Sequence, residues 1–182
     1  MSELNFLRLE YSMKNSNTFA TLSALLLVSS MSHAQICDPN LTRTAPDSRY
    51  QEVAGSDGAE ILDLQTQLIW QRCSIGQQWN GVICTGTATK HTWTDALARA
   101  KALGGDYRLA NIKELQSLVE EACDIKINQR FFPQTPDSRF WSSSPVANTR
   151  NDAWTMYYSI YDRWQKWGKA EPYYVRAVRS VQ

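Results

Sequence analysis

The stretch TWTDALARAKALGGDYRLANIKELQSLVEEAC, residues 92–123, decides the fold because it holds the two best-marked helices of the chain. The first helix is predicted to start at Thr92, an N-cap residue followed three positions later by Asp95. It is predicted to end at Gly104-Gly105, where a helix often closes with a left-handed residue. The apolar positions between these limits follow helical spacing. They are Trp93, Ala96, Leu97, Ala100 and Leu103.

The second helix is predicted from its cap and its apolar stripe. Asn111 is the cap residue and Glu114 stands at the third helical position, a pair that resembles a capping box. The stripe expected to face the core is Ile112, Leu115, Leu118, Val119 and Ala122. The neighbouring carboxylates Glu120 and Glu121 are expected on solvated faces, because adjacent helix residues point apart.

Strands are predicted on both sides of the helices. Upstream, 61–64 and 68–70 are short strands joined by a turn at Gln65–Gln67. Downstream, the chain after Phe140-Trp141 is aromatic and β-like, with strand formers at 153–161 and further strands expected around Trp164 and Trp167 and at 174–181. Helices in the first half and strands in the second indicate an α+β domain rather than an alternating α/β one.

The N-terminus has the layout of a secretory signal peptide. An apolar run at 18–31 is too short to span a bilayer, Lys14 precedes it, and Ser32-His33-Ala34 follows with small residues. Met13 is the expected true start and Ala34 the expected cleavage position, and a retained N-terminal anchor is the alternative. The predicted organisation is a signal peptide at 1–34, an extended lead-in at 35–50 and a single domain at 51–182. Export implies a periplasmic, secreted or cell-surface location without a membrane span after cleavage.

The four cysteines all follow the predicted cleavage position. An even number in an oxidising compartment indicates disulfides. Cys73 and Cys84 suit a local bridge, and Cys37 with Cys123 would then tie the mature N-terminus to the domain, although four cysteines allow three connectivities. The alternative of a zinc site lacks the CxxC pairs that such sites usually contain.

Several classes of chemistry are disfavoured. The 19 Lys and Arg against 18 Asp and Glu give no global attraction for nucleic acid. The mature chain keeps only His91, with no nucleophile elbow, phosphate loop or dinucleotide fingerprint. We therefore expect no catalysis, no cofactor and no metal centre. A loose calcium site remains an open alternative, although such residues more often form turns. It would use Asp137, Asn148, Asn151 and Asp152.

The aromatic content is the most informative functional signal. The chain has 7 Trp and 8 Tyr, concentrated after residue 140. In a one-sided sheet one strand face meets the core, and the other would display rings beside cations. Rings cover the apolar face of a sugar and cations meet a carboxylate or sulfate. The predicted ligand-binding residues are Tyr161, Arg163, Trp164, Lys166, Trp167 and Lys169. Ordinary packing of a hairpin is the alternative.

Other conspicuous side chains are assigned to structure. Trp70, Trp93 and Trp141 stand in hydrophobic or capped contexts. Arg108 and Glu114 flank a helix entry, where charges often pair.

Four segments resemble the C-terminal domains of the Legionella collagen-like adhesin family. They are 63–73 (DLQTQLIWQRC), Trp93 with Ala96 and Ala100, 107–115 (YRLANIKEL) with 127–128 and 132–133, and 140–144 (FWSSS) with 175–179 (VRAVR). Ala110 departs from the proline usual in the family. Weaker similarity to the C-type-lectin-like fold of formylglycine-generating enzymes implies two helices, a twisted, mostly antiparallel sheet and one loop-built binding edge. The best-known adhesin member is trimeric and binds sulfated polysaccharides.

Three functional hypotheses follow, from different classes. The first is an exported, non-catalytic binding module for a glycan or acidic polysaccharide. The alternative is an interaction or assembly subunit of an envelope complex, with the aromatic C-terminal face buried against a partner protein or in a homo-oligomer. The third is a hydrolase-type enzyme, which would need a deep pocket with two converging carboxylates.

Overall fold

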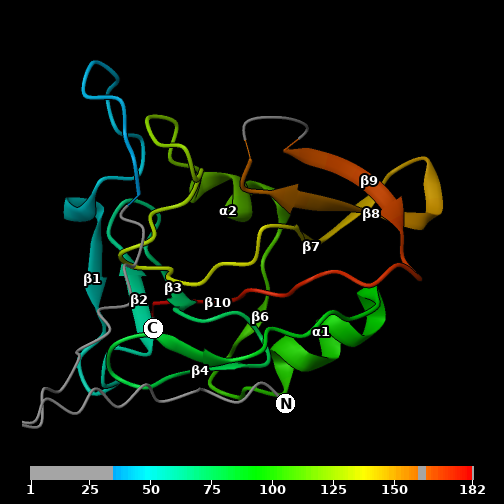
Figure 1. Cartoon of the computed structure of the whole chain (residues 1–182). Helices are drawn as coiled ribbons and strands as arrows, with labels where there is room; N and C mark the ends of the chain where they lie inside the picture. Colours follow the sequence, from blue (N-terminus) through cyan, green and yellow to red (C-terminus); the bar gives the residue numbers. More distant parts are fainter. Residues whose placement is uncertain (1–34, 160–162, 182) are drawn as a thin grey trace, which may run out of the picture. The chain divides into compact units, whose positions relative to one another are not determined.

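The computed structural model describes residues 35–159 and 163–181, and within them an α+β fold (Figure 1). A five-stranded antiparallel sheet has the order β1-β2-β3-β10-β6, and a three-stranded antiparallel sheet has the order β7-β8-β9. The first contains Tyr50–Glu52 (β1), Glu60–Asp63 (β2), Leu68–Gln71 (β3), Ala177–Ser180 (β10) and Arg108–Leu109 (β6). The second contains Arg139–Val146 (β7), Thr149–Tyr157 (β8) and Trp164–Gly168 (β9). The helices are Trp93–Lys101 (α1) and Ile112–Ser117 (α2), so the predicted fold class is confirmed.

The β2–β3 hairpin forms where the sequence predicts it, and Asp63 explains its turn. The Asp63 carboxylate accepts hydrogen bonds from the backbone of Gln65 and Thr66 and from the Thr66 hydroxyl at 2.7 Å. The same carboxylate is paired with the guanidinium of Arg49, and both side chains are buried. One buried ion pair therefore fixes the hairpin against the lead-in.

Both predicted helix starts are confirmed. Thr92 accepts a hydrogen bond from the Asp95 amide at 3.4 Å. Asn111 and Glu114 form a complete capping box, with bonds of 2.9 and 2.7 Å. Arg108 adds a two-pronged ion pair to Glu114, which confirms the structural role predicted for both side chains. Burial alone would raise the pKa of the Glu114 carboxyl, but the bond from Arg108 and the Asn111 amide hold it below its usual range.

The predicted end of the second helix is wrong, because α2 stops at Ser117 and not at Ala122. Glu120, expected in solvent, is fully buried. Its carboxylate accepts hydrogen bonds of 3.0 to 3.2 Å from the backbone amides of Thr44, Ala45 and Ala122, and one from the Arg43 side chain. The hydrogen bonds that this carboxylate accepts, most of them from the lead-in, outweigh the further turn of helix that the apolar stripe favours. Burial would raise its pKa, but these hydrogen bonds keep the pKa low.

Both predicted disulfides are present, Cys37–Cys123 and Cys73–Cys84. The second bridge is local, and the hairpin of Gln77–Trp79 (β4) and Cys84–Gly86 (β5) lies beside it. The lead-in is extended only in part: a 3-10 turn (η1) occupies Asp47–Arg49, and Ala45 is fully buried.

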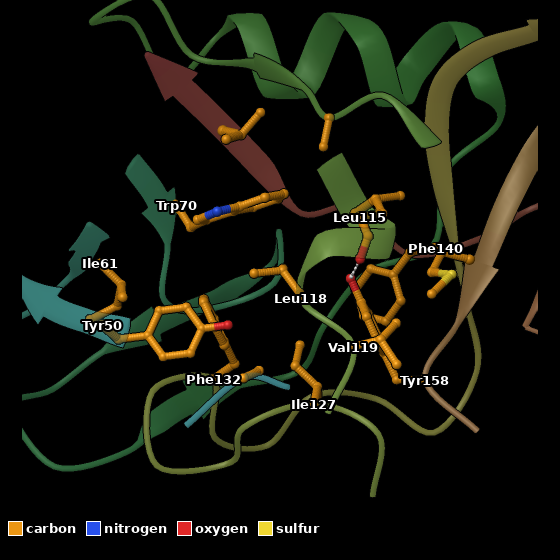
Figure 2. Close-up of a cluster of buried hydrophobic side chains, with 14 residues drawn as sticks. Tyr50, Ile61, Trp70, Leu115, Leu118, Val119, Ile127, Phe132, Phe140 and Tyr158 are labelled. Atoms are coloured by element: carbon orange, nitrogen blue, oxygen red, sulfur yellow. Dashed lines mark hydrogen bonds between the residues drawn. The ribbon is translucent and has the colours of Figure 1, made fainter. Parts of the chain in front are cut away.

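Two hydrophobic clusters lie on opposite sides of the β7–β8 pair. The first, shown in Figure 2, joins α2, the five-stranded sheet and the 118–132 segment around Trp70, Phe140 and Met156. The second joins α1, β6 and β10 around Trp141 and Ala153. Adjacent residues of β7 and β8 thus enter different clusters, because strand side chains alternate between faces. The predicted structural roles of Trp70 and Trp141 are confirmed, since both are fully buried.

Candidate functional site

The residues predicted to bind a ligand do not share one surface, because β9 alternates between two faces. In the β8–β9 register Trp164 stands opposite Met156 and Trp167 stands opposite Ala153. Met156 belongs to the cluster beneath α2, and Ala153 belongs to the cluster beneath α1. Trp164 and Lys166 therefore occupy one face of β9, while Trp167 and the following Lys169 occupy the other. The expectation of a single display face is wrong.

Two other members of the predicted set need separate mention. Tyr161 lies outside the described residues. Arg163 forms a two-pronged ion pair with Glu121, with one N–O distance of 2.7 Å, and it also donates to the Ser159 carbonyl. Its hydrogen-bonding edge is thus already used within the protein.

The α1-side face of the three-stranded sheet gathers an aromatic and cationic group, which we call the aromatic–cationic face: Arg139, Tyr157, Trp167, Lys169 and Tyr173. The Arg139 guanidinium carbon lies 5.7 Å from the ring centroids of both Tyr157 and Trp167. The Trp167 ring is 5.9 Å from Tyr173 in an edge-on arrangement, and Tyr173 packs in turn on buried Trp141 at 5.1 Å. The rings are therefore supported from below.

Hydrogen bonds fix the position of two further groups on this face. The Tyr157 hydroxyl donates to Asp137 at 2.6 Å, and this bond raises the pKa of the phenol. The Lys169 ammonium lies 4.3 Å from the Trp93 ring centroid and donates to the Arg150 carbonyl at 2.7 Å. Within the described residues Lys169 makes no ion pair, so its charge is held by a ring and a carbonyl rather than neutralised by a carboxylate.

Sequence reasoning missed the contribution of Arg139 and Tyr173 to this face. Arg139 reaches it because β7 pairs with β8, which sets Arg139 opposite Tyr157. Tyr173 reaches it through an isolated bridge to His91, far away in the sequence. Neither pairing has a local signal. By contrast, the separation of Trp164 from Trp167 by three positions in a strand does indicate opposite faces, so that part was readable from the sequence.

The four residues of the calcium alternative are not brought together. Asp137 precedes β7 and bonds Tyr157 at the end of β8, whereas Asn148 stands at the other end of the β7–β8 hairpin, followed by Asn151 and Asp152 on β8. The described residues hold no group of three acidic, histidine or cysteine side chains placed to bind a metal.

Two hollows occur elsewhere on the described surface. One of about 300 Å³ is bordered by Asp124, Ile125, Asp137, Tyr158 and Ser159 among others. The other, of about 400 Å³, is bordered mainly by hydroxyl and amide side chains, including Thr44, Thr66, Gln116 and Ser117. Glu121 is its one carboxylate, and it is paired with Arg163, so the second hollow lacks converging carboxylates for acid–base chemistry.

Comparison with protein families decides the class of the domain. The family model described as the Lcl C-terminal domain matches residues 59–179, which is more than half of the 182 residues. The chain belongs to the Lcl C-terminal domain family. No curated protein matches the chain. The match runs from the start of the β2–β3 hairpin to β10, so it includes both helices and all of the aromatic–cationic face.

Membership in the Lcl C-terminal domain family makes this an adhesin-related binding domain. Together with the two disulfides it indicates a location at the cell surface or outside the cell. In the part of the chain that the structure describes, no helix has the length and hydrophobicity needed to cross a membrane.

Proposed function

We propose that the protein is an exported, non-catalytic binding module that recognises an acidic polysaccharide through the aromatic–cationic face. The observation that carries the proposal is Trp167, a residue 39% exposed whose ring contacts Tyr173 and Arg139, with Lys169 two residues further along the chain. A family of adhesin-related domains is the expected setting for such a surface.

The chemistry of this face suits a charged sugar. An exposed indole offers an apolar surface on which a sugar ring can stack, and its neighbours prevent it from collapsing onto the core. A carboxylate or sulfate on the same sugar would meet the Lys169 ammonium, which the Trp93 ring and the Arg150 carbonyl hold in place. The ring and the cation together favour an acidic polysaccharide over a neutral one.

Trp164 and Lys166 supply matched controls, because they have the same residue types on the same strand but lie on the opposite face. We expect a heparin-derived oligosaccharide to bind in isothermal titration calorimetry, and a neutral dextran fragment not to bind. Trp167→Ala should weaken the dissociation constant at least about tenfold, whereas Trp164→Ala should leave it within about twofold.

The charge on the face is tested in the same way. Lys169→Gln should weaken oligosaccharide binding about fivefold at low salt and less at high salt, because salt screens exposed charges. Lys166→Gln should have little effect. Equal losses from the two tryptophan variants, or no binding of the acidic oligosaccharide at all, would refute the proposal.

A further inference from the structure

The outer edge of β9 is unpaired in the described residues. β9 ends the three-stranded sheet, and β8 is its one neighbour there (Figure 1). The Tyr157 amide donates to the Arg163 carbonyl at 2.6 Å, and the Lys169 amide donates to the Asn151 carbonyl at 2.7 Å. Antiparallel pairing alternates, so the odd-numbered residues of β9 turn their backbone groups toward β8. The backbone N–H and C=O of Trp164 and Lys166 therefore point outward, and no segment within 35–159 or 163–181 bonds them.

The edge has the composition of a contact surface. Trp164 is 51% exposed on one face of the strand and Trp167 is 39% exposed on the other, with exposed Lys166 between them. A row of unpaired backbone groups is a template for another strand, and the flanking rings add apolar area on both faces.

The β9 sequence is complementary to itself in reverse. When Arg163-Trp164-Gln165-Lys166-Trp167 is laid antiparallel on a second copy with Gln165 facing Gln165, Trp164 faces Lys166 of the partner subunit. In the same register Arg163 faces Trp167 of the partner subunit. Each of these pairs occurs twice by symmetry, so all four set a cation against an indole ring, an attractive arrangement.

Geometry favours this register over its neighbours. The pairs Trp164 with Lys166 join residues whose backbone groups both point outward, as a new ladder requires. The register that places Lys166 opposite itself would oppose like charges. Arg163 can stack on a ring without leaving Glu121, because the ion pair uses the edge of its guanidinium and not its planar face.

We propose that β9 is a homodimer interface, in which two copies of this chain join their three-stranded sheets into one antiparallel six-stranded sheet. The two-fold axis passes between the paired Gln165 residues and is perpendicular to the sheet. The contact is isologous, as is usual for a symmetric dimer. It does not rest on polysaccharide binding, which uses the face of the sheet and not its edge.

Sedimentation equilibrium of the full chain tests the dimer. Dimerisation gives twice the mass of the 20.8 kDa chain. Lys166→Pro removes one outward N–H without removing a bond to β8, since edge strands tolerate proline where the N–H faces away. This variant should be monomeric with an unchanged circular dichroism spectrum, whereas Lys166→Arg, which keeps both N–H and cation, should remain dimeric.

Exchange of the two facing residues tests the register independently of proline. Trp164→Lys alone opposes two ammonium groups and should weaken dimerisation at least about tenfold. The double variant Trp164→Lys with Lys166→Trp restores each cation–ring pair and should restore the dimer.

A crosslink tests the symmetry axis directly. Residues facing each other between hydrogen-bonded pairs have Cα atoms about 4.5 Å apart, within disulfide range. Gln165→Cys should therefore form a covalent dimer on oxidation, and Thr94→Cys, on the exposed surface of α1, should not. A wild-type chain that is monomeric and whose Gln165→Cys variant gives no covalent dimer overturns the proposal. A chain that pairs only with an added acidic peptide also overturns it, and assigns the edge to a different partner.

Discussion

The segment after α2 and the strand β9 both carry charges next to rings, but they use them differently. Around α2, Glu120 and the Arg49–Asp63 pair are buried, and each charge meets fixed donors or acceptors inside the chain. Along β9, Lys166 is exposed, and Lys169 meets a ring and a carbonyl. In the first region the charges bind one another and the backbone, and so help to specify the fold. In the second region, charge remains available for an external partner. Substitutions should therefore change stability in the first region and binding in the second.

The largest expected loss of stability comes from removing the disulfide that joins the lead-in to the rest of the domain. The Cys37–Cys123 bond closes a sequence separation of 86 residues, and the Cys73–Cys84 bond one of 11. Replacing Cys37 and Cys123 by serine should lower the free energy of unfolding by about 4 kcal/mol, because the longer loop gains more entropy on unfolding. Replacing the other pair should cost about 3 kcal/mol. Urea denaturation of both variants measures the difference, and an equal or reversed order would contradict it.

The next largest loss of stability should distinguish two adjacent carboxylates, Glu120 and Glu121. Glu120→Gln should lower the unfolding free energy by about 2–3 kcal/mol, because it removes the buried charge that three backbone amides and Arg43 share. Glu121→Gln is the matched control, and it should cost less than about 1 kcal/mol since it breaks an exposed ion pair. Thermal denaturation of the two variants checks the contrast. Similar losses of stability would mean that burial of the carboxylate does not determine its contribution.

Lowering the pH should destabilise the protein through carboxylates in the same region. The folded-state pKa values of Glu114 and Glu120 lie below their usual 4.5, so their contribution to stability is present above that pH. It is lost as the pH falls below about 4.5 toward the folded-state pKa values, because the unfolded chain binds protons first. Urea titrations between pH 7 and pH 3 should show this fall, with a shallower slope in Glu120→Gln. An unchanged slope in the variant would rule out Glu120 as a source.

The smallest effect on stability should come from β9 itself. Trp164→Ala and Trp167→Ala should each change the unfolding free energy by less than about 1 kcal/mol, because both rings are partly in solvent. Met156→Ala, on the buried partner position of β8, should cost about 3 kcal/mol and serves as the comparison. Thermal melts measure all three. A large loss from either tryptophan variant would show that β9 holds the core together and is not reserved for a partner.

Features with local chemistry were predictable from the sequence. The helix starts at Thr92 and Asn111 and the turn after Asp63 depend on residues close in sequence. The even number of cysteines indicates disulfides, although counting alone leaves three possible pairings. The end of α2 was not predictable, because Glu120 is held by amides some 75 residues upstream. The aromatic–cationic face was predicted only in part, since Arg139 and Tyr173 reach it through long-range pairing. The C-type-lectin-like likeness stays a prediction.

The ion pair between Arg163 and Glu121 also affects how the protein would respond to mechanical tension. Glu121 lies two residues before Cys123, whose bond to Cys37 fastens the lead-in, while Arg163 directly precedes β9. Tension applied between the lead-in and a ligand bound at β9 would thus pass through the Cys37–Cys123 disulfide and then through the Arg163–Glu121 ion pair. This route does not include the hydrogen bonds of the five-stranded sheet. The ion pair is weaker than the covalent bonds on that route, so it would break before the disulfide.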